Sequence, residues 1–351
     1  VDGNGVEDIF VSGAAGQTGQ LLLRYKNAPP KRITTPFNPH LNHEDMGALF
    51  FDLEGDGDLD LYVVSGGVEC APSHSWLQDR VYLNDGKGRF ESDPSKLPDM
   101  RLSGSSVAAA DFDQDGDLDL FVGGFSKPGS YPIAERNVLL RNEKGTLVEV
   151  SDTVAPSLAN SGLVKGAIWS DVNLDGWIDL LVCHHWGPVR YFQNQKGILI
   201  DTTDSAGLSQ YAGLWNGIAG ADIDNDGDMD YAVTNLGLNT KYHATKEKPF
   251  TIFYGDMDGS GKKRLIEAEF EGDKWYPVRG KSCSTLAMPS LQNKFPNFGS
   301  FAIATLEEIY PPSKLNESQR FDATHLQSGV FINAGRGHFD FNPFPRLAQI
   351  T

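Results

Sequence analysis

Four segments of the chain carry the same nine-residue pattern of oxygen-bearing side chains. They begin at Asp52, Asp111, Asp171 and Asp222. Oxygen ligands at positions 1, 3, 5 and 9, together with the carbonyl of position 7, are what a hard cation such as calcium binds. Glycine at position 6 permits a positive φ, so that the chain turns and these groups converge. Each pattern closes at position 9 and runs into an apolar segment, whereas an EF-hand loop ends at position 12 and continues as a helix.

The alternative for one isolated stretch rich in aspartate and glycine is a solvated turn. Four complete copies in one chain favour metal binding instead. The predicted calcium ligands in these copies are Asp52, Glu54, Asp56, Asp58 and Asp60; Asp111, Asp113, Asp115, Asp117 and Asp119; Asp171, Asn173, Asp175, Trp177 and Asp179; and Asp222, Asp224, Asp226, Asp228 and Asp230.

Two further copies of the pattern are incomplete. The chain opens inside one of them, and its positions 3, 5, 7 and 9 are Asp2, Asn4, Val6 and Asp8. The other supplies Asp256, Asp258 and Ser260, but its ninth position is Arg264. A cation in place of a ligand repels calcium, so this site is expected to be weak or empty. We therefore predict four to five calcium sites and a sixth, degenerate one, with the highest occupancy where four carboxylates meet.

The spacing of the loops predicts the architecture. Successive loops start 50 to 60 residues apart, and each unit has the same order of elements. A segment of small residues precedes the loop, an apolar segment follows it, and a variable connection leads to a hairpin turn such as the one at Asn84 or Asn142. Four strands per unit are typical of a β-propeller blade.

The segment from Gly104 to Gly124, Gly-x-x-x-Ala-x-x-Asp-x-Asp-x-Asp-Gly-x-x-Asp-Leu-x-Val-Gly-Gly, resembles the FG-GAP/VCBS repeat of integrin α-subunit propellers and of secreted bacterial proteins. It is most similar to the bacterial branch associated with ASPIC/UnbV domains, and no such domain is recognised in this sequence. The resemblance implies that the calcium loops lie on one face of the propeller. The opposite face would then present the variable connections 65–79, 123–135, 184–188 and 235–248, where a ligand is expected.

The predicted fold is therefore an all-β propeller of four-stranded blades over residues 1–351, with a partly helical insertion at 273–327. The insertion is expected to act as a cap over a blade edge, with a functional lid as the alternative. The repeats cover about five to six blades of a probable seven. We expect further chain at both ends, or a partner, to supply the remainder of the ring.

The formal charge of −17 is accounted for mainly by the loops. There is no basic stripe for nucleic acid, and no apolar run has the length needed to span a bilayer. A calcium-loaded propeller is expected to be extracellular, on the cell surface or periplasmic.

No HExxH, GxSxG or Walker A motif is present. The candidate ligand-binding residues on the loop face are His184, His185, Trp186, Trp76 and Trp215, with a structural role as the alternative for each. Two functions remain open. The favoured one is a non-enzymatic adhesion or scaffold module that binds protein or glycan. The other is a carbohydrate-active enzyme resembling a polysaccharide lyase, with His184 or His185 as its base.

Overall fold

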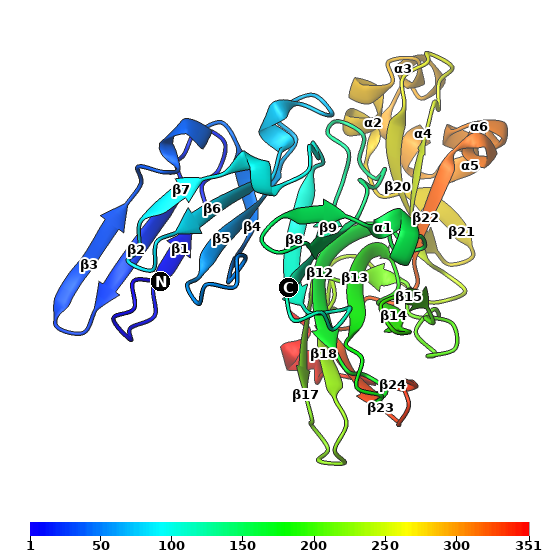
Figure 1. Ribbon diagram of the computed structural model, residues 1–351. Helices are drawn as coiled ribbons and strands as arrows, with labels where there is room; N and C mark the ends of the chain where they lie inside the picture. Colours follow the sequence, from blue (N-terminus) through cyan, green and yellow to red (C-terminus); the bar gives the residue numbers. More distant parts are fainter. Residues whose placement is uncertain (351) are drawn as a thin grey trace.

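The computed structural model describes residues 1–350, and most of its strands belong to antiparallel sheets that follow one another along an open arc (Figure 1). The first sheet has three strands, β1 (Ile9–Val11), β2 (Gln20–Tyr25) and β3 (Ala28–Ile33). The second contains β4 (Glu44–Phe51), β5 (Asp60–Gly66), β6 (Arg80–Asn84) and β7 (Phe90–Ser92). The third contains β8 (Gly104–Ala110), β9 (Asp119–Gly124), β10 (Val138–Asn142) and β11 (Leu147–Glu149). The prediction of an all-β fold built from propeller blades is confirmed.

The fourth sheet contains β12 (Leu163–Ser170), β13 (Asp179–Gly187), β14 (Arg190–Asn194) and β15 (Leu199–Asp201), with the short β16 (Gly213–Leu214) paired to β13. A one-turn helix, α1 (Ser151–Val154), precedes it. The fifth sheet is ordered β17 (Gly217–Ala221), β18 (Asp230–Thr234), β23 (Gly329–Asn333) and β24 (Phe339–Pro343).

The first strands of the second to fifth sheets, β4, β8, β12 and β17, lie against one another in that order. Such close approach explains why these strands are rich in small residues. At Gly104, for example, a Cβ atom would lie 2.3 Å from Val64 Cγ1 of the preceding sheet. Apolar cores fill the spaces between neighbouring sheets, as where Phe121 of the third packs in one cluster with Leu180 and Phe192 of the fourth.

The fifth blade is divided by a long excursion. Its second strand pairs directly with β23, as in Tyr231 opposite Phe331, although residues 235–328 lie between them in the chain. The excursion contains a separate sheet, ordered β21 (Lys274–Pro277), β20 (Arg264–Glu271), β19 (Phe250–Gly255) and β22 (Gln319–Ala323). The predicted insertion, 273–327, is the second half of this excursion. The earlier half resembles a blade in sequence because β19 and β20 flank a loop of the repeated pattern.

Five short helices complete the excursion: α2 (Lys281–Ala287), α3 (Leu291–Lys294), α4 (Phe298–Ala302), α5 (Leu306–Ile309) and α6 (Pro312–Glu317). They pack on β19 and β20 around a core of their own that includes Phe253, Met288 and Tyr310. Thr305 and Glu308 form a capping box at the start of α5. Within residues 1–350, no helix combines the length and apolar character that crossing a bilayer requires.

Candidate metal centres

The backbone of the four complete loops has the predicted turn. The glycine at position 6 has a φ of +91° at Gly57, +100° at Gly116, +86° at Gly176 and +100° at Gly227. Its N–H donates to the carboxylate at position 1, for example from Gly116 to Asp111 Oδ2 at 3.1 Å. Position 4 also has a positive φ, which the sequence analysis missed because Gln114, Leu174 and Asn225 are not glycines.

Two loops bring three carboxylates together. Asp111, Asp113 and Asp115 each offer an oxygen within 4.8 Å of the others, as do the corresponding Asp222, Asp224 and Asp226. In the first of these loops, Asp113 Oδ1 is shielded from solvent and has no hydrogen-bond partner. A shielded carboxylate oxygen without a donor is unfavourable, and a bound cation would satisfy it.

Shielded carboxylate oxygens without a partner also occur at position 7 of two other loops, at Asp58 Oδ1 and Asp228 Oδ1. Desolvation, with the charge of neighbouring Asp226, raises the pKa of Asp228 to about 6. A bound cation would accept a lone pair from the oxygen that has no donor. Its charge would also offset the repulsion between the carboxylates. The residues present therefore fit a hard divalent cation such as calcium.

The loop at Asp52 differs from the other two loops that carry four side-chain carboxylates at the ligand positions. Its position-3 residue, Glu54, is ion-paired with Lys96 at 2.7 Å. Because Lys96 places a positive charge on Glu54 Oε1, the sequence alone overstated the equivalence of these loops.

Two loops contain amides that are already engaged. Asn173 donates to Asp175 Oδ2 at 2.9 Å and accepts from the Asp175 N–H at 3.0 Å. In the first, incomplete loop, Asn4 Nδ2 donates to Asp2 Oδ2 at 3.0 Å. These contacts hold the oxygen-bearing groups at positions 3 and 5 close together. Val6 and Trp177, at position 7, are candidates only through their carbonyl groups.

The carboxylate at position 9 joins each loop to its own blade. Asp119 is fully buried and accepts from the Phe112 N–H at 3.1 Å and the Asn142 N–H at 2.8 Å. Asp60, Asp179 and Asp230 make the equivalent pairs of bonds. Burial raises the pKa of Asp119 to about 7, against the opposing effect of these N–H donors. Each oxygen keeps a second lone pair that could bind a cation.

A hairpin asparagine connects each loop to the next blade. Asn142 Nδ2 of the third sheet donates to the carbonyl of Leu53, at position 2 of the preceding loop, at 2.9 Å. Asn84, Asn194 and Asn333 bond in the same way to the position-2 carbonyls of Val1, Phe112 and Val172. The sequence analysis identified Asn84 and Asn142 only as turn residues. We call these four residues the linking asparagines.

In the first sheet, Arg24 occupies the corresponding place. Its N–H donates to Asp8 Oδ1 at 2.7 Å, and the Asp8 carboxylate also bonds the amino group of Val1. Asn27 lies in the exposed turn beyond it.

The sixth loop keeps the backbone of the others. Gly259 and Gly261 have φ values of +74° and +79°, and the Gly261 N–H donates to Asp256 Oδ2 at 2.9 Å. Asp256 Oδ1 is shielded and has no partner. Bonds from Ser260, together with the charge of Arg264, lower the pKa of Asp258.

Two of the candidate ligand-binding residues belong to the core instead. His184 is 1% exposed, with Nε2 2.8 Å from Ser161 Oγ and Nδ1 3.3 Å from the Pro188 carbonyl. Burial lowers its pKa to about 3. Trp215 is fully buried and donates to the Tyr211 carbonyl at 2.9 Å. Because their side chains are buried, His184 and Trp215 are not positioned to contact a ligand, and their prediction as ligand-binding residues is corrected.

The other candidates are partly exposed. Trp186 donates to Tyr131 Oη at 2.6 Å, and the ring of His185 lies 5.4 Å from that of Phe125. Lys165 Nζ stands 4.6 Å from the centre of the Phe125 ring. We call Phe125, Tyr131, Lys165, His185 and Trp186 the aromatic cluster. It lies at the ends of β9 and β13 that are remote from the loops at Asp111 and Asp171. Trp76 lies apart from it, in the second blade, against His74.

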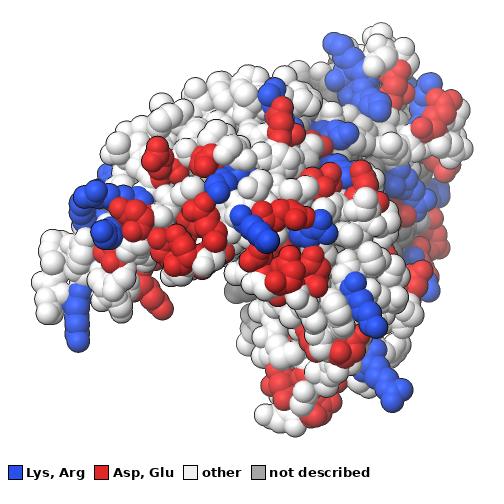
Figure 2. Space-filling model, in the orientation of Figure 1, with Lys and Arg blue, Asp and Glu red and all other residues white. Residues whose placement is uncertain are grey.

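The distribution of charge agrees with this division into faces. In Figure 2, Asp and Glu side chains gather below the arc and at the tip of the β17–β18 hairpin, where the loop at Asp222 lies. The inserted segment, at the upper right, carries prominent Lys and Arg side chains.

Comparison with known proteins identifies the repeat. The model of the FG-GAP-like repeat matches residues 70–122 and 171–233. No match is found among curated proteins. One similar solved structure is BBS1N in complex with ARL6DN, at 12% identity and a TM-score of 0.35, covering 78% of this chain and 82% of that one. Another is the biofilm matrix protein Bap1 of V. cholerae, at 11% identity and a TM-score of 0.29, covering 96% and 66% respectively.

Proposed function

We propose that this chain, which contains FG-GAP-like repeats, is a calcium-stabilised binding module that contacts its partner through the face opposite the metal loops. The observation that carries the calcium role is the shielded oxygen of Asp113, which has no partner and belongs to a group of three carboxylates with Asp111 and Asp115. A carboxylate oxygen that is shielded from water and has no hydrogen-bond donor is stabilised when it binds a cation.

Calcium would act as a structural element. The linking asparagines and the position-9 carboxylates join each metal loop to two blades. A cation that orders one loop would therefore also order the contact with the neighbouring blade. Since the cation binds the folded state, it stabilises that state by mass action.

The aromatic cluster supports a binding role for the opposite face. Aromatic side chains with one polar edge are suited to packing on sugar rings or on apolar side chains of a protein. Lys165 adds a positive charge on an otherwise acidic chain. We propose a protein or glycan partner, and a location outside the cell, on its surface or in the periplasm, where calcium is abundant.

The lyase hypothesis loses one of its two candidate bases. His184 is enclosed, and both ring nitrogens have hydrogen-bond partners. His185 remains partly exposed but is bonded to Asn216 Oδ1 at 3.0 Å. No specific contact favours catalysis over binding.

A calcium titration by calorimetry tests the first half of the proposal. We expect several ions to bind per chain, and Asp113→Asn to weaken one class of site. A chain that binds no calcium would refute it.

A glycan and protein interaction panel tests the second half. Trp186→Ala should reduce binding to any partner found, because it removes a partly exposed indole ring from the aromatic cluster. The matched control is Trp177→Ala, which changes a tryptophan on the metal-loop face and keeps its carbonyl. Equal loss in both variants would argue against the assigned face.

A further inference from the structure

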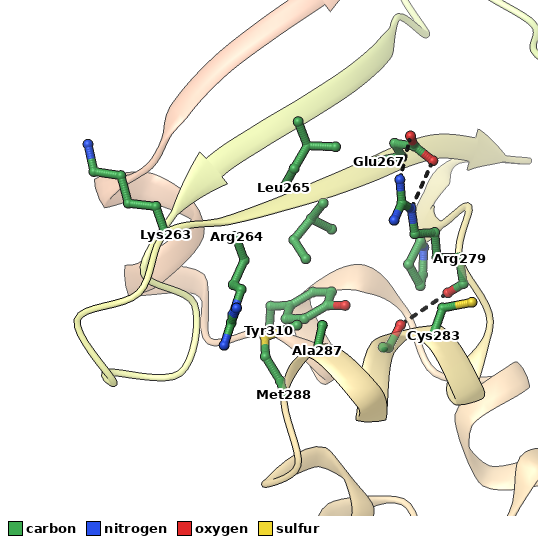
Figure 3. Close-up of a pocket in the computed structure, with 12 residues that line it drawn as sticks. Lys263, Arg264, Leu265, Glu267, Arg279, Cys283, Ala287, Met288 and Tyr310 are labelled. Atoms are coloured by element: carbon green, nitrogen blue, oxygen red, sulfur yellow. Dashed lines mark hydrogen bonds and ion pairs between the residues drawn. The ribbon is translucent and has the colours of Figure 1, made fainter. Parts of the chain in front are cut away.

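The inserted segment contains a pocket that is separate from the metal loops and from the aromatic cluster. It lies between β20 and α2, and Tyr310 forms part of its floor (Figure 3). Its volume is about 230 Å³, which corresponds to about eight water-sized volumes. This is room for a small organic molecule.

One side of the pocket is apolar. Ile266, Ala287, Met288 and Tyr310 line it, and Met288 and Tyr310 are 1% and 2% exposed. Both belong to the core of the excursion, so the apolar wall is held in place by packing. An apolar surface of this kind favours a ligand with a hydrocarbon body.

The other side carries positive charge. Lys263, Arg264 and Arg279 line the pocket together with a single carboxylate, Glu267. Glu267 is already paired with Arg279, at 3.2 and 3.4 Å, as the dashed lines in Figure 3 show. The pocket therefore retains a net positive charge.

Of the three cations that line the pocket, Arg279 is ion-paired, and Arg264 is the one with a shielded N–H group. Its Nε is shielded from solvent and has no hydrogen-bond acceptor, and its guanidinium forms no ion pair within residues 1–350. Its charge is felt by Asp258, whose pKa it helps to lower, but the two groups are not in contact. A shielded guanidinium N–H is unfavourable until an acceptor meets it, and a carboxylate matches its geometry.

The chain that follows β20 is also positively charged. Between positions 274 and 306 the chain contains Lys274, Arg279, Lys281 and Lys294 and no Asp or Glu, although the whole chain has a formal charge of −17. An anion would thus meet a favourable local field here, in contrast to the metal-loop face.

We propose that this pocket binds a small organic carboxylate, with the anionic group on Arg264 and the hydrocarbon body against Met288 and Tyr310. The chemical class is an aryl- or alkyl-substituted acid of about ten non-hydrogen atoms, a size set by the volume of the pocket. A free inorganic anion would use the charge but leave the apolar wall uncovered.

The test uses the full chain in calcium buffer and 4-phenylbutyrate as the probe, with 4-phenylbutanol as the neutral analogue. Ligand-observed NMR and calorimetry should show saturable binding of the acid, at least tenfold tighter than that of the alcohol. Arg264→Gln should remove this tenfold preference and leave the binding of the alcohol unchanged. Inorganic phosphate should not displace the acid.

Two variants on α2 check the location. Ala287→Trp fills the pocket from an exposed position and should abolish binding of both probes, whereas Leu286→Trp, on the same helix and 86% exposed, should leave both unchanged. Unchanged melting temperatures would verify that the variants are folded. The proposal is overturned by absent saturation, by equal affinity for acid and alcohol, by an unaffected Arg264→Gln, or by effective competition from phosphate.

Discussion

The loops at Asp111 and Asp256 have nearly the same backbone and differ in how they are attached. In both, the residues at positions 4 and 6 have positive φ, and the N–H of position 6 donates to the first aspartate, at 3.1 and 2.9 Å. Both also contain a shielded carboxylate oxygen without a partner. At position 9, however, one has Asp119 and the other Arg264.

The ninth residue determines what each loop is joined to. Asp119 bonds two backbone N–H groups, one in its loop and one on Asn142 of the same blade. Arg264 makes no such bonds and lines the pocket of the inserted segment. The comparison shows that the turn geometry is encoded within the first six positions. The ninth position integrates the loop into a blade.

The largest expected effect is that of removing calcium. Excess chelator should lower the melting temperature by about 10 °C or more, reversibly, because several sites each contribute through mass action. Magnesium should restore little of this loss, since it dehydrates reluctantly. Chelator should lower the melting temperature of the Arg264→Ala variant by as much as it lowers that of the parent chain. If chelator leaves the melting curve unchanged, calcium does not stabilise the chain, and the loops at Asp111 and Asp256 do not differ in this function.

The second effect separates the two ninth residues directly. Asp119→Ala leaves the N–H groups of Phe112 and Asn142 buried without an acceptor, and should reduce the free energy of unfolding by about 3 to 5 kcal/mol. Arg264→Ala should change it by less than about 1 kcal/mol, because no hydrogen bond is lost. Denaturant unfolding in calcium buffer measures both. Similar losses would mean that the ninth position does not anchor the loop.

The sequence predicted the turn of the repeated loops well because this turn lies within nine residues and depends on local glycines. It also identified the sixth, degenerate loop, which lies between the antiparallel strands β19 and β20. Both features follow from short-range patterns that a single chain displays directly.

Long-range contacts were beyond such patterns. The bond from Asn142 to Leu53 spans 89 residues, and nothing near Asn142 indicates its partner. The split of the fifth blade was hidden for the same reason, since β18 and β23 are 94 residues apart and a loop of the repeat pattern lies between them. His184 was a reasonable candidate by residue type, but its burial depends on Ser161 and Pro188 in the folded chain.

The third prediction concerns the linking asparagines. Asn142→Ala removes the donor to Leu53 and the acceptor of the Gly145 N–H, both buried, and should cost about 2 kcal/mol. Asn27→Ala, in an exposed turn without this role, is the matched control and should be neutral. In a double-mutant cycle with Asp52→Ala, the effects should be non-additive if Asn142 acts through the neighbouring metal loop. Strict additivity would show that the blades bind calcium independently.

The smallest effect on stability, and the most direct test of the comparison, is expected from Arg264→Asp. The sixth loop already has the backbone turn and an orphaned oxygen on Asp256; it has Ser260 at position 5 and lacks the carboxylate at position 9. The substitution removes a repelling charge and adds a ligand, so it should raise the calcium stoichiometry by one. Stability should rise only slightly, because β19 and β20 are already held by β21, β22 and the helices. Calorimetric titration beside Arg264→Asn, which removes the charge but supplies a weaker ligand, distinguishes the two contributions. If neither variant gains an ion, the difference between the loops at Asp111 and Asp256 must lie in the first six positions rather than in the ninth.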